Sequence, residues 1–303
     1  MKTKRDFLRI WDLSSKEITF LIERAIELKS GIDANKCPLI GKSIGLLFEK
    51  ASTRTRVSME VAIYQLGAQS IYMSQKEMQI GRGETIHDTA KVLSRYLDAV
   101  VIRTFSHMNL IEFASHSSIP VINGLSDIHH PCQALADLMT ILEKKGHLKS
   151  IRLAYLGDGN NVANSLIEAA SVMGMDLSIA CPKGCEPNPD VFKKANSFKK
   201  SRITILKDPG EATHKADAVY TDVWVSMGQE KDAPRKKRKF KNYQLNADLL
   251  SNAKKDAIVL HCMPAHRGEE ITDDVIDGPQ SVVFDQAENR LHIQKALLEF
   301  FLT

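Results

Sequence analysis

Apolar and polar positions alternate along this chain with the periods of strands and helices. In the first half, short apolar runs predict strands at 43–48, 69–73, 99–102 and 120–122. Apolar residues at helical spacing predict helices near 53–66, 85–97 and 107–117. A capping-box pattern, Ser14-Ser-Lys-Glu17, precedes one more helix with an apolar face. Strands that alternate with helices indicate βαβ units on a parallel sheet.

The same rhythm starts again after a long predicted helix, Pro131 to Lys145, which ends at Gly146. Predicted strands follow at 152–156, 176–180, 203–206, 218–221, 257–260 and 281–284, with helices at 161–174, 189–198 and 289–302. The fold class is therefore α/β, with two doubly wound parallel-sheet domains joined by long helices and the active site in the interdomain cleft. We expect a first domain at 1–145 and a second at 150–288, with the C-terminal helix 289–303 packing back on the first.

The composition is that of an ordinary globular protein. A length of 303 residues is enough for two domains, and 43% hydrophobic with 26% charged residues is typical. Because no apolar run could span a bilayer and no apolar segment follows the basic N-terminus, we expect neither a membrane partner nor a secretory signal. Five irregularly spaced cysteines argue against a disulfide framework, which favours a cytoplasmic location.

The net positive charge of the chain comes from one segment, Lys231 to Lys241. It holds seven basic residues and one acidic residue, while the whole chain has a net charge of only +4. Such a run can mark a nucleic-acid patch, but it has few aromatic residues to stack on bases. We interpret it as a solvated, mobile surface loop and expect no nucleic-acid partner.

The most informative segment is the turn Ser52-Thr-Arg-Thr-Arg56, which joins a predicted strand to a predicted helix. A helix N-terminus favours an anion, and arginine matches phosphate oxygens. The turn therefore predicts a phosphate pocket built without a glycine-rich loop, with Arg54 aimed at the anion. We expect Arg56 to hold the helix and the neighbouring loop. The alternative is ordinary helix capping by Ser52 or Thr53, with both arginines in solvent.

Further polar clusters follow predicted strands or open predicted helices, where ligands bind in such sheets. They are Gln79 to Glu84, Arg103, His129 to Gln133, Gly157 to Asn161, Asp222 to Gly228 and His261 to Pro264. Several also have simpler interpretations: a salt bridge for Arg103, helix capping for His130 and a small buried side chain for Cys262.

Two motifs suggest cofactors only weakly. Cys181-Pro-Lys-Gly-Cys185 has no second pair or histidine run beside it, so we dismiss zinc. Gly157-Asp-Gly-Asn-Asn-Val162 starts like a dinucleotide fingerprint but has valine at its sixth position. The acid at the right distance, Asp176, stands at the start of its strand and not at its end. We therefore expect no metal and no cofactor.

Taken together, these strings resemble the ornithine carbamoyltransferases, in the aspartate/ornithine carbamoyltransferase superfamily, over essentially the whole chain. The resemblance rests on Ser52-Thr-Arg-Thr-Arg56, Gln79-Ile-Gly-Arg-Gly-Glu-Thr85, His130-Pro-Cys-Gln133, Asp158-Gly-Asn-Asn161, Asp222-Val-Trp-Val-Ser-Met-Gly228 and His261-Cys-Met-Pro264. Met263 departs from the leucine usual at its place, a change that conserves volume. The resemblance implies transfer of the carbamoyl group of carbamoyl phosphate to the δ-amine of L-ornithine, giving L-citrulline and phosphate, in arginine metabolism.

The resemblance also implies the site residues. It gives catalytic roles to Arg103, His130, Asp222 and Cys262. It places carbamoyl phosphate at Ser52, Thr53, Arg54, Thr55, Gln79, Arg103, His130, Pro131, Cys132, Gln133, Cys262, Met263 and Arg290. It places ornithine at Asn161, Asp222, Ser226 and Met227. Gln79 is expected to reach the site of a neighbouring subunit in a homotrimer.

Other functions are compatible with parts of the pattern. A sister enzyme acting on putrescine, aspartate or an acylated amino acid is the nearest, although Asp222 with Ser-Met-Gly favours a free α-amino acid. An NAD-dependent dehydrogenase and a nucleic-acid-binding protein are more distant. We hypothesise that Cys262 with Asp222 takes a proton from the δ-amine. We also expect Ser226 to Gly228, with the basic run, to form a lid over ornithine. Either arginine synthesis or arginine breakdown is compatible with the sequence.

Overall fold

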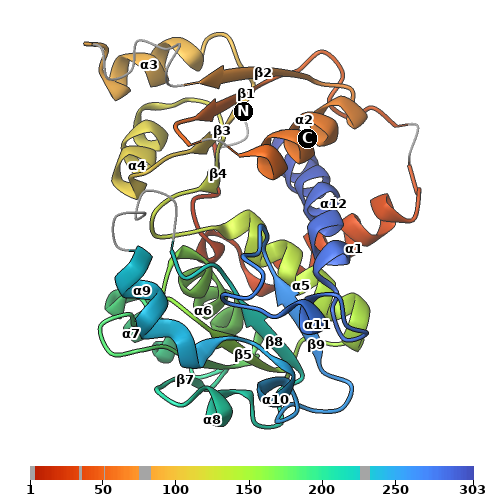
Figure 1. The fold of residues 1–303 in the computed structure, drawn as a ribbon. Helices are drawn as coiled ribbons and strands as arrows, with labels where there is room; N and C mark the ends of the chain where they lie inside the picture. Colours follow the sequence, from red (N-terminus) through yellow and green to blue (C-terminus); the bar gives the residue numbers. More distant parts are fainter. Residues whose placement is uncertain (1–3, 34–35, 51, 75–82, 226–232) are drawn as a thin grey trace. The chain divides into compact units, whose positions relative to one another are not determined.

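The computed structural model describes residues 4–33, 36–50, 52–74, 83–225 and 233–303. By their contacts the residues divide into two compact units, one of residues 1–135 with 289–303 and one of residues 136–288. The boundaries fall inside two long helices, α5 (Pro131–Lys145) and α12 (Val283–Leu302), drawn in yellow-green and blue in Figure 1. Across the described ranges, no helix is both long and apolar enough to cross a membrane.

The first unit is built on a parallel sheet with the strand order β2-β1-β3-β4 (Figure 1). Its strands are β1 (Ser43–Phe48), β2 (Gln69–Ser74), β3 (Ala99–Arg103) and β4 (Val121–Leu125). Its helices include α1 (Ser15–Lys29), α2 (Thr53–Gln65), α3 (Ile86–Leu93) and α4 (His107–His116). The winding reverses between β1 and β3, where Phe48 pairs with Arg103. Ligands bind at such switch points, so the turn after β1 and Arg103 share the relevant edge.

The second unit has a parallel sheet with the order β7-β6-β5-β8-β9. Its strands are β5 (Arg152–Leu156), β6 (Asp176–Ala180), β7 (Ile203–Leu206), β8 (Ala218–Thr221) and β9 (Ile258–His261). Its helices include α6 (Asn161–Met173), α7 (Pro189–Ser197), α8 (Pro209–Thr213), α9 (Ala233–Phe240), α10 (Ala247–Leu250) and α11 (Asp273–Ile276). The winding reverses between β5 and β8. Thr221 pairs with both Leu156 and His261, which brings the ends of three strands together.

The hydrophobic pattern predicts most of these elements correctly, and β1, α5, β5, β6, β7 and β8 agree to the residue. The capping box at Ser14 is confirmed, because its side chain and that of Glu17 bond reciprocally to backbone N–H groups. The strand predicted at 281–284 is wrong. Ser281 forms only an isolated bridge with Val259, and α12 begins two residues later. The buried valines at 282–283 pack in the core without extending the ladder.

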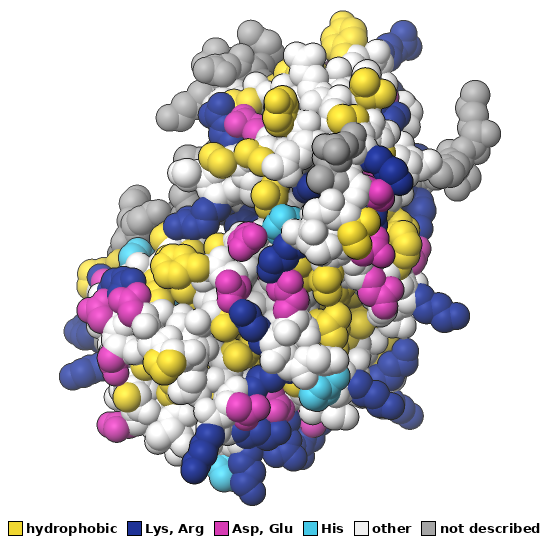
Figure 2. Space-filling view, turned by 90° about the vertical axis from the view of Figure 1, so that its right-hand side faces the viewer, with side chains coloured by type: hydrophobic (Ala, Val, Ile, Leu, Met, Phe, Trp, Pro, Cys, Tyr) yellow, Lys and Arg dark blue, Asp and Glu magenta, His cyan; other side chains and the backbone are white. Residues whose placement is uncertain are grey.

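The loop predicted over the basic run is also wrong where the structure describes it, because α9 is a helix. Phe240 at its end is fully buried and stacks on Trp224, with ring centroids 5.9 Å apart. Burial of such a ring stabilises by about 2–3 kcal/mol. Lys236 Nζ lies 2.5 Å from Asp158 Oδ2 and Lys237 Nζ 2.5 Å from Glu269 Oε1. These two ion pairs disfavour a nucleic-acid patch at α9. Figure 2 draws another face of the molecule, where basic and acidic side chains are interspersed.

Candidate active site

The turn after β1 begins with a helix cap. Ser52 is the N-cap of α2, and its Oγ accepts a hydrogen bond from Thr55 N at 3.2 Å. Capping by Ser52 is therefore confirmed, whereas phosphate binding by Ser52, Thr53 and Thr55 stays a prediction. The two roles are compatible, since a capped N-terminus still presents N–H groups of its first turn.

The two arginines of this turn differ in their contacts. Arg56 Nε pairs with Glu60 on the same helix at 3.0 Å, and its guanidinium lies 3.6 Å from the ring centroid of Tyr72 on β2. Arg56 thus holds the helix, as predicted, and it contacts the neighbouring strand rather than a loop. Arg54 is half-buried and makes no hydrogen bond or ion pair with any residue in the described ranges. Its guanidinium is available for a ligand.

The buried guanidinium groups of Arg290 and Arg103 both act on the imidazole of His130 in the first unit. Arg290 on α12 donates from Nη2 to Thr55 Oγ1 at 2.7 Å. Arg290 and Arg103 are only 4% and 7% exposed. Burial holds the pKa of His130 well below its usual range, and the positive charges of Arg290 and Arg103 lower it further. The two arginines can bind an anion, and the neutral imidazole of His130 can donate a hydrogen bond without adding charge. The cluster therefore suits a ligand with one anionic end and one polar, uncharged end.

The start of α5 supplies two buried side chains beside His130. Burial raises the pKa of Cys132 to about 12, and its thiol donates to Asn123 O at 3.4 Å. Cys132 therefore stays protonated near neutral pH and is no nucleophile. Gln133 is 1% exposed, and Pro131 opens the helix. The contacts of Cys132 fit a structural role, with ligand contact left as a prediction.

Glu49, which the sequence reasoning missed, ties the ends of β1 and β3 together. Its Oε2 accepts from Thr104 Oγ1 at 2.5 Å and from Phe105 N at 2.8 Å. Its own N donates to Arg103 O at 2.8 Å. These bonds fix the backbone that carries Arg103. The available signal was a charged residue directly after a buried strand and three residues before Ser52.

His107 and His129 form a buried histidine pair that gives the first unit a pH dependence. Burial lowers the pKa of His129 to about 3, and it also lowers the pKa of His107, whose ring centroid lies 4.8 Å away. Unfolded histidine titrates near 6.5, so below about pH 6.5 the unfolded chain binds more protons than the native chain. The free energy of unfolding is therefore lost as pH falls. From His129 alone we expect a loss of about 2 kcal/mol between pH 7 and pH 5.

Urea unfolding at pH 7 and pH 5 measures this loss in the free energy of unfolding. His129→Gln should flatten the dependence relative to the parent chain, and His147→Gln, at an exposed site, should leave it unchanged. Equal pH dependence in the parent chain and in His129→Gln would contradict the assignment.

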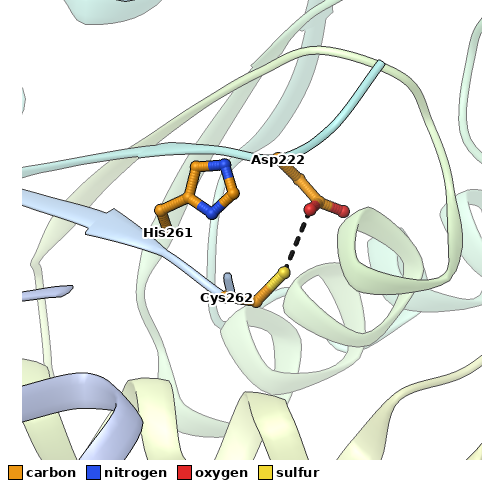
Figure 3. A group of neighbouring side chains, drawn as sticks. All are labelled: Asp222, His261 and Cys262. Carbon is orange, nitrogen blue, oxygen red and sulfur yellow. Dashed lines mark hydrogen bonds between the residues drawn. The ribbon is translucent and has the colours of Figure 1, made fainter. Parts of the chain in front are cut away.

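In the second unit, Asp222 and Cys262 come together at the ends of β8 and β9. Cys262 Sγ donates to Asp222 Oδ1 at 3.0 Å, as the dashed line in Figure 3 shows. Asp222 is 4% exposed, and Val223 N donates to its Oδ1 at 2.8 Å. Asn160 Nδ2 donates to its Oδ2 at 2.7 Å. The simpler interpretation of Cys262 as a small buried side chain does not hold, because Cys262 is half-buried and donates a hydrogen bond to Asp222.

His261 holds the loop that carries Cys262 and Met263. Its Nδ1 accepts from Met263 N at 2.9 Å, so the ring proton sits on Nε2, which faces Glu270 Oε1 at 3.2 Å. Both His261 and Glu270 have fully buried side chains. Although His261 lies close to Asp222 and Cys262 (Figure 3), both of its nitrogens are engaged within the protein. This disfavours His261 as a metal ligand.

Two substitutions separate the contacts of His261. Asparagine places an amide oxygen near the Nδ1 position and keeps the bond from Met263 N, whereas glutamine keeps the donor toward Glu270. His261→Gln leaves Met263 N without its acceptor and loosens the loop that carries Cys262, so we expect kcat/KM to fall roughly tenfold. An unsatisfied N–H costs about 1–3 kcal/mol, so the thermal midpoint should fall as well. His261→Asn keeps that bond, so it should lower the thermal midpoint through the lost contact with Glu270 and leave kcat/KM within about twofold of the parent. Steady-state kinetics and thermal melting of both variants check this, and identical behaviour would contradict it.

Two family models match this chain, one over each parallel-sheet region. The carbamoyl-P binding domain model of the aspartate/ornithine carbamoyltransferases matches residues 5–143, and the Asp/Orn binding domain model matches residues 149–301. The chain belongs to the aspartate/ornithine carbamoyltransferase family. A relative from Syntrophus aciditrophicus, named ornithine carbamoyltransferase, is 51% identical over 99% of this chain and 100% of its own length. One from Thermoplasma acidophilum, named ornithine carbamoyltransferase, catabolic, is 51% identical over 98% of each chain.

Solved structures give the same picture. This carbamoyltransferase chain is similar to the ornithine carbamoyltransferase from Pyrococcus furiosus, with a TM-score of 0.94 and 49% identity over 98% of this chain and 96% of that one. The structure from Gloeobacter violaceus gives 0.89 and 45% identity over the full length of both. The prediction of two parallel-sheet α/β domains is confirmed.

Family membership removes the dehydrogenase and nucleic-acid alternatives for this carbamoyltransferase. The acid considered for ribose, Asp176, accepts a hydrogen bond from Arg202 N at 2.9 Å and has a structural contact instead. Arg290 falls within the residues matched by the Asp/Orn domain model, yet its guanidinium contacts Thr55 of the first unit.

Four predicted features lie outside the described residues: Gln79, Ser226, Met227 and the lid segment Ser226 to Gly228. Asn161 is the first residue of α6 and is half-buried. The residue before it, Asn160, lies in the same predicted cluster but was given no role, although it bonds directly to Asp222. Its position as N-cap of a helix at the sheet's switch point was the available signal.

Proposed function

We propose that this chain catalyses attack of the δ-amine of L-ornithine on the carbonyl carbon of carbamoyl phosphate. The C–N bond forms, the C–O bond to phosphate breaks, and the amine loses a proton, giving L-citrulline and phosphate. Relatives at 51–54% identity over nearly the whole chain are named ornithine carbamoyltransferases, which favours ornithine over aspartate as acceptor. That likeness is the observation that carries the proposal.

For the first unit, we propose that the phosphate binds at Ser52, Thr53, Arg54 and Thr55, with Arg103 and Arg290. Negative charge grows on the leaving phosphate as the C–O bond breaks, and fixed donors stabilise it most in a desolvated setting. His130 is neutral and buried, so it donates to the carbamoyl oxygen. Gln133 adds an amide next to it.

For the second unit, we propose that Asp222 binds the α-ammonium of ornithine and Asn161 its carboxylate, with Ser226 and Met227. Cys262 contacts Asp222 at 3.0 Å, which supports a route by which the δ-amine loses a proton. An alkyl amine titrates near 10, so the site must favour the neutral form. A Cys262→Ser variant with an unchanged rate and pH profile would remove Cys262 from this role.

An assay for carbamoylated product tests the function directly. Carbamoyl phosphate is supplied with ornithine, putrescine or aspartate in separate reactions. Product from ornithine only is the expected result. Putrescine lacks the carboxylate of ornithine, so product from putrescine at an equal rate would argue against a carboxylate site, and activity with aspartate alone would overturn the proposal.

We further propose a homotrimer in the cytoplasm, with Gln79 completing a neighbouring site, in which case a solution mass of about three chains is expected. Large hydrophobic side chains exposed on the first unit, including Tyr64 at 80% and Tyr96 at 72%, support assembly through that unit. Light scattering tests this, and a stable monomer with full activity would contradict it. Flux measured in cells supplied with ornithine or with citrulline tests the biosynthetic direction.

A further inference from the structure

The carboxylate of Asp222 is held by bonds on both oxygens. Oδ1 accepts from Cys262 Sγ and Val223 N, at 3.0 and 2.8 Å. Oδ2 accepts from Asn160 Nδ2 at 2.7 Å. A carboxylate offers about four acceptor sites in all, so Oδ2 keeps capacity for one more donor. The direction of that remaining site depends on how Asn160 turns the carboxylate.

Asn160 is itself fixed by the start of α6. Its Oδ1 accepts from Val162 N at 2.9 Å and Ala163 N at 3.2 Å, which satisfies two N–H groups of the first helical turn. Tyr155 Oη lies 3.3 Å from the same oxygen. These donors set the orientation of the amide, because its oxygen must face the helix and its nitrogen must face Asp222.

We infer that Asn160 is a positioning residue that orients Asp222 for the α-ammonium of the amino-acid acceptor. The inference rests on the proposed role of Asp222 in binding ornithine. Asn160 acts through Asp222 by linking the rigid N-terminus of α6 to the carboxylate at the end of β8. A neutral donor at this place also leaves the negative charge of Asp222 intact for the ammonium.

Aspartate at this position separates capping from positioning. Asn160→Asp keeps an oxygen for the N–H groups of α6, and aspartate caps a helix as well as asparagine does. It replaces the donor to Asp222 by a second carboxylate. Asn188→Asp is the matched control, because Asn188 Oδ1 caps α7 in the same way, accepting from Asp190 N at 2.9 Å and Val191 N at 3.3 Å.

We expect Asn160→Asp to raise KM for ornithine about 100-fold near pH 8, with a thermal midpoint close to that of the parent chain. Two adjacent carboxylates share a proton as pH falls, and the shared proton restores a donor to Asp222. The ratio of variant to parent kcat/KM should therefore rise from pH 8 to pH 6. Asn188→Asp should match the parent in both respects.

Neighbouring titratable groups are common to the parent and the variant, so the ratio isolates the new pair. They include Tyr155, Asp158, Tyr220, Lys236, His261 and Cys262. Asn160→Ser, which keeps a cap but is too short to reach Asp222, should lose activity without the pH-dependent recovery.

Three measurements distinguish the possible failures. If Asn160→Asp behaves like Asn188→Asp, the inference is overturned. If its loss shows no recovery at low pH and equals that of Asn160→Ser, the loss does not involve the charge of Asp222, and the inference is again overturned. If Asp222→Asn binds ornithine with an unchanged KM, the proposed role of Asp222 fails first, whatever Asn160 does.

Discussion

Replacing Arg54 by methionine is expected to lower kcat/KM for carbamoyl phosphate about a thousandfold, whereas Arg56→Met should change it less than about threefold. Both residues lie in the same turn, but Arg56 is engaged by Glu60 and Tyr72. Arg54 has no such contact with the described residues. Its charge is therefore available to the phosphate dianion and is most effective as the C–O bond breaks.

The pair of variants provides its own control. Each loses one positive charge from one helical turn, so a general effect of net charge would lower both rates alike. Initial rates with carbamoyl phosphate varied at saturating ornithine give kcat/KM, and thermal melting detects misfolding. We expect Arg56→Met, which loses an ion pair and a stacking contact, to melt at a lower temperature. Equal kinetic losses would contradict the assignment of Arg54.

The secondary structure was predictable wherever the spacing of apolar residues was enough to distinguish a strand from a helix. Strand β1 is an uninterrupted apolar run with turn residues after it, and its ends were predicted to the residue. The apolar run that ends near Val283 led to a strand prediction that was wrong. Apolar residues are selected both where a chain packs in the core and where it pairs in a sheet, so the run alone does not distinguish the two. The prediction for α9 was wrong for the opposite reason. Its basic residues indicate exposure to solvent, and the helix is recognisable only from tertiary contacts such as that of Phe240 with Trp224.

The candidate site divides in a similar way. Arg54, Asp222 and Cys262 were identifiable because each lies in a short polar motif that follows a predicted strand. Glu49 and Asn160 were not, because each acts by a bond to a residue distant in the sequence, such as that of Asn160 with Asp222. Such partners follow from strand order and register, which a single sequence does not contain.

The second large effect concerns the two ends of one strand. Asp217 precedes β8 and Asp222 follows it. Asp217 Oδ1 accepts from Lys254 Nζ at 2.5 Å and its Oδ2 from Arg152 N at 2.9 Å. Asp222 instead bonds to Cys262 and Asn160, at the end of the sheet where ligands bind. The same substitution at the two ends therefore separates a structural carboxylate from a functional one.

Asp222→Asn is expected to lower kcat/KM for ornithine about a thousandfold, since a desolvated ammonium loses its counter-charge at a cost of about 2–5 kcal/mol. Asp217→Asn should lower the thermal midpoint and leave KM for ornithine within about twofold of the parent, because surface ion pairs do not reach the opposite end of a strand. Initial rates with ornithine varied, together with melting curves for both variants, check these outcomes. A loss of ornithine affinity in Asp217→Asn as large as that in Asp222→Asn would mean that both act through the stability of β8. In that case the carboxylate after the strand would have no specific role toward the amino acid.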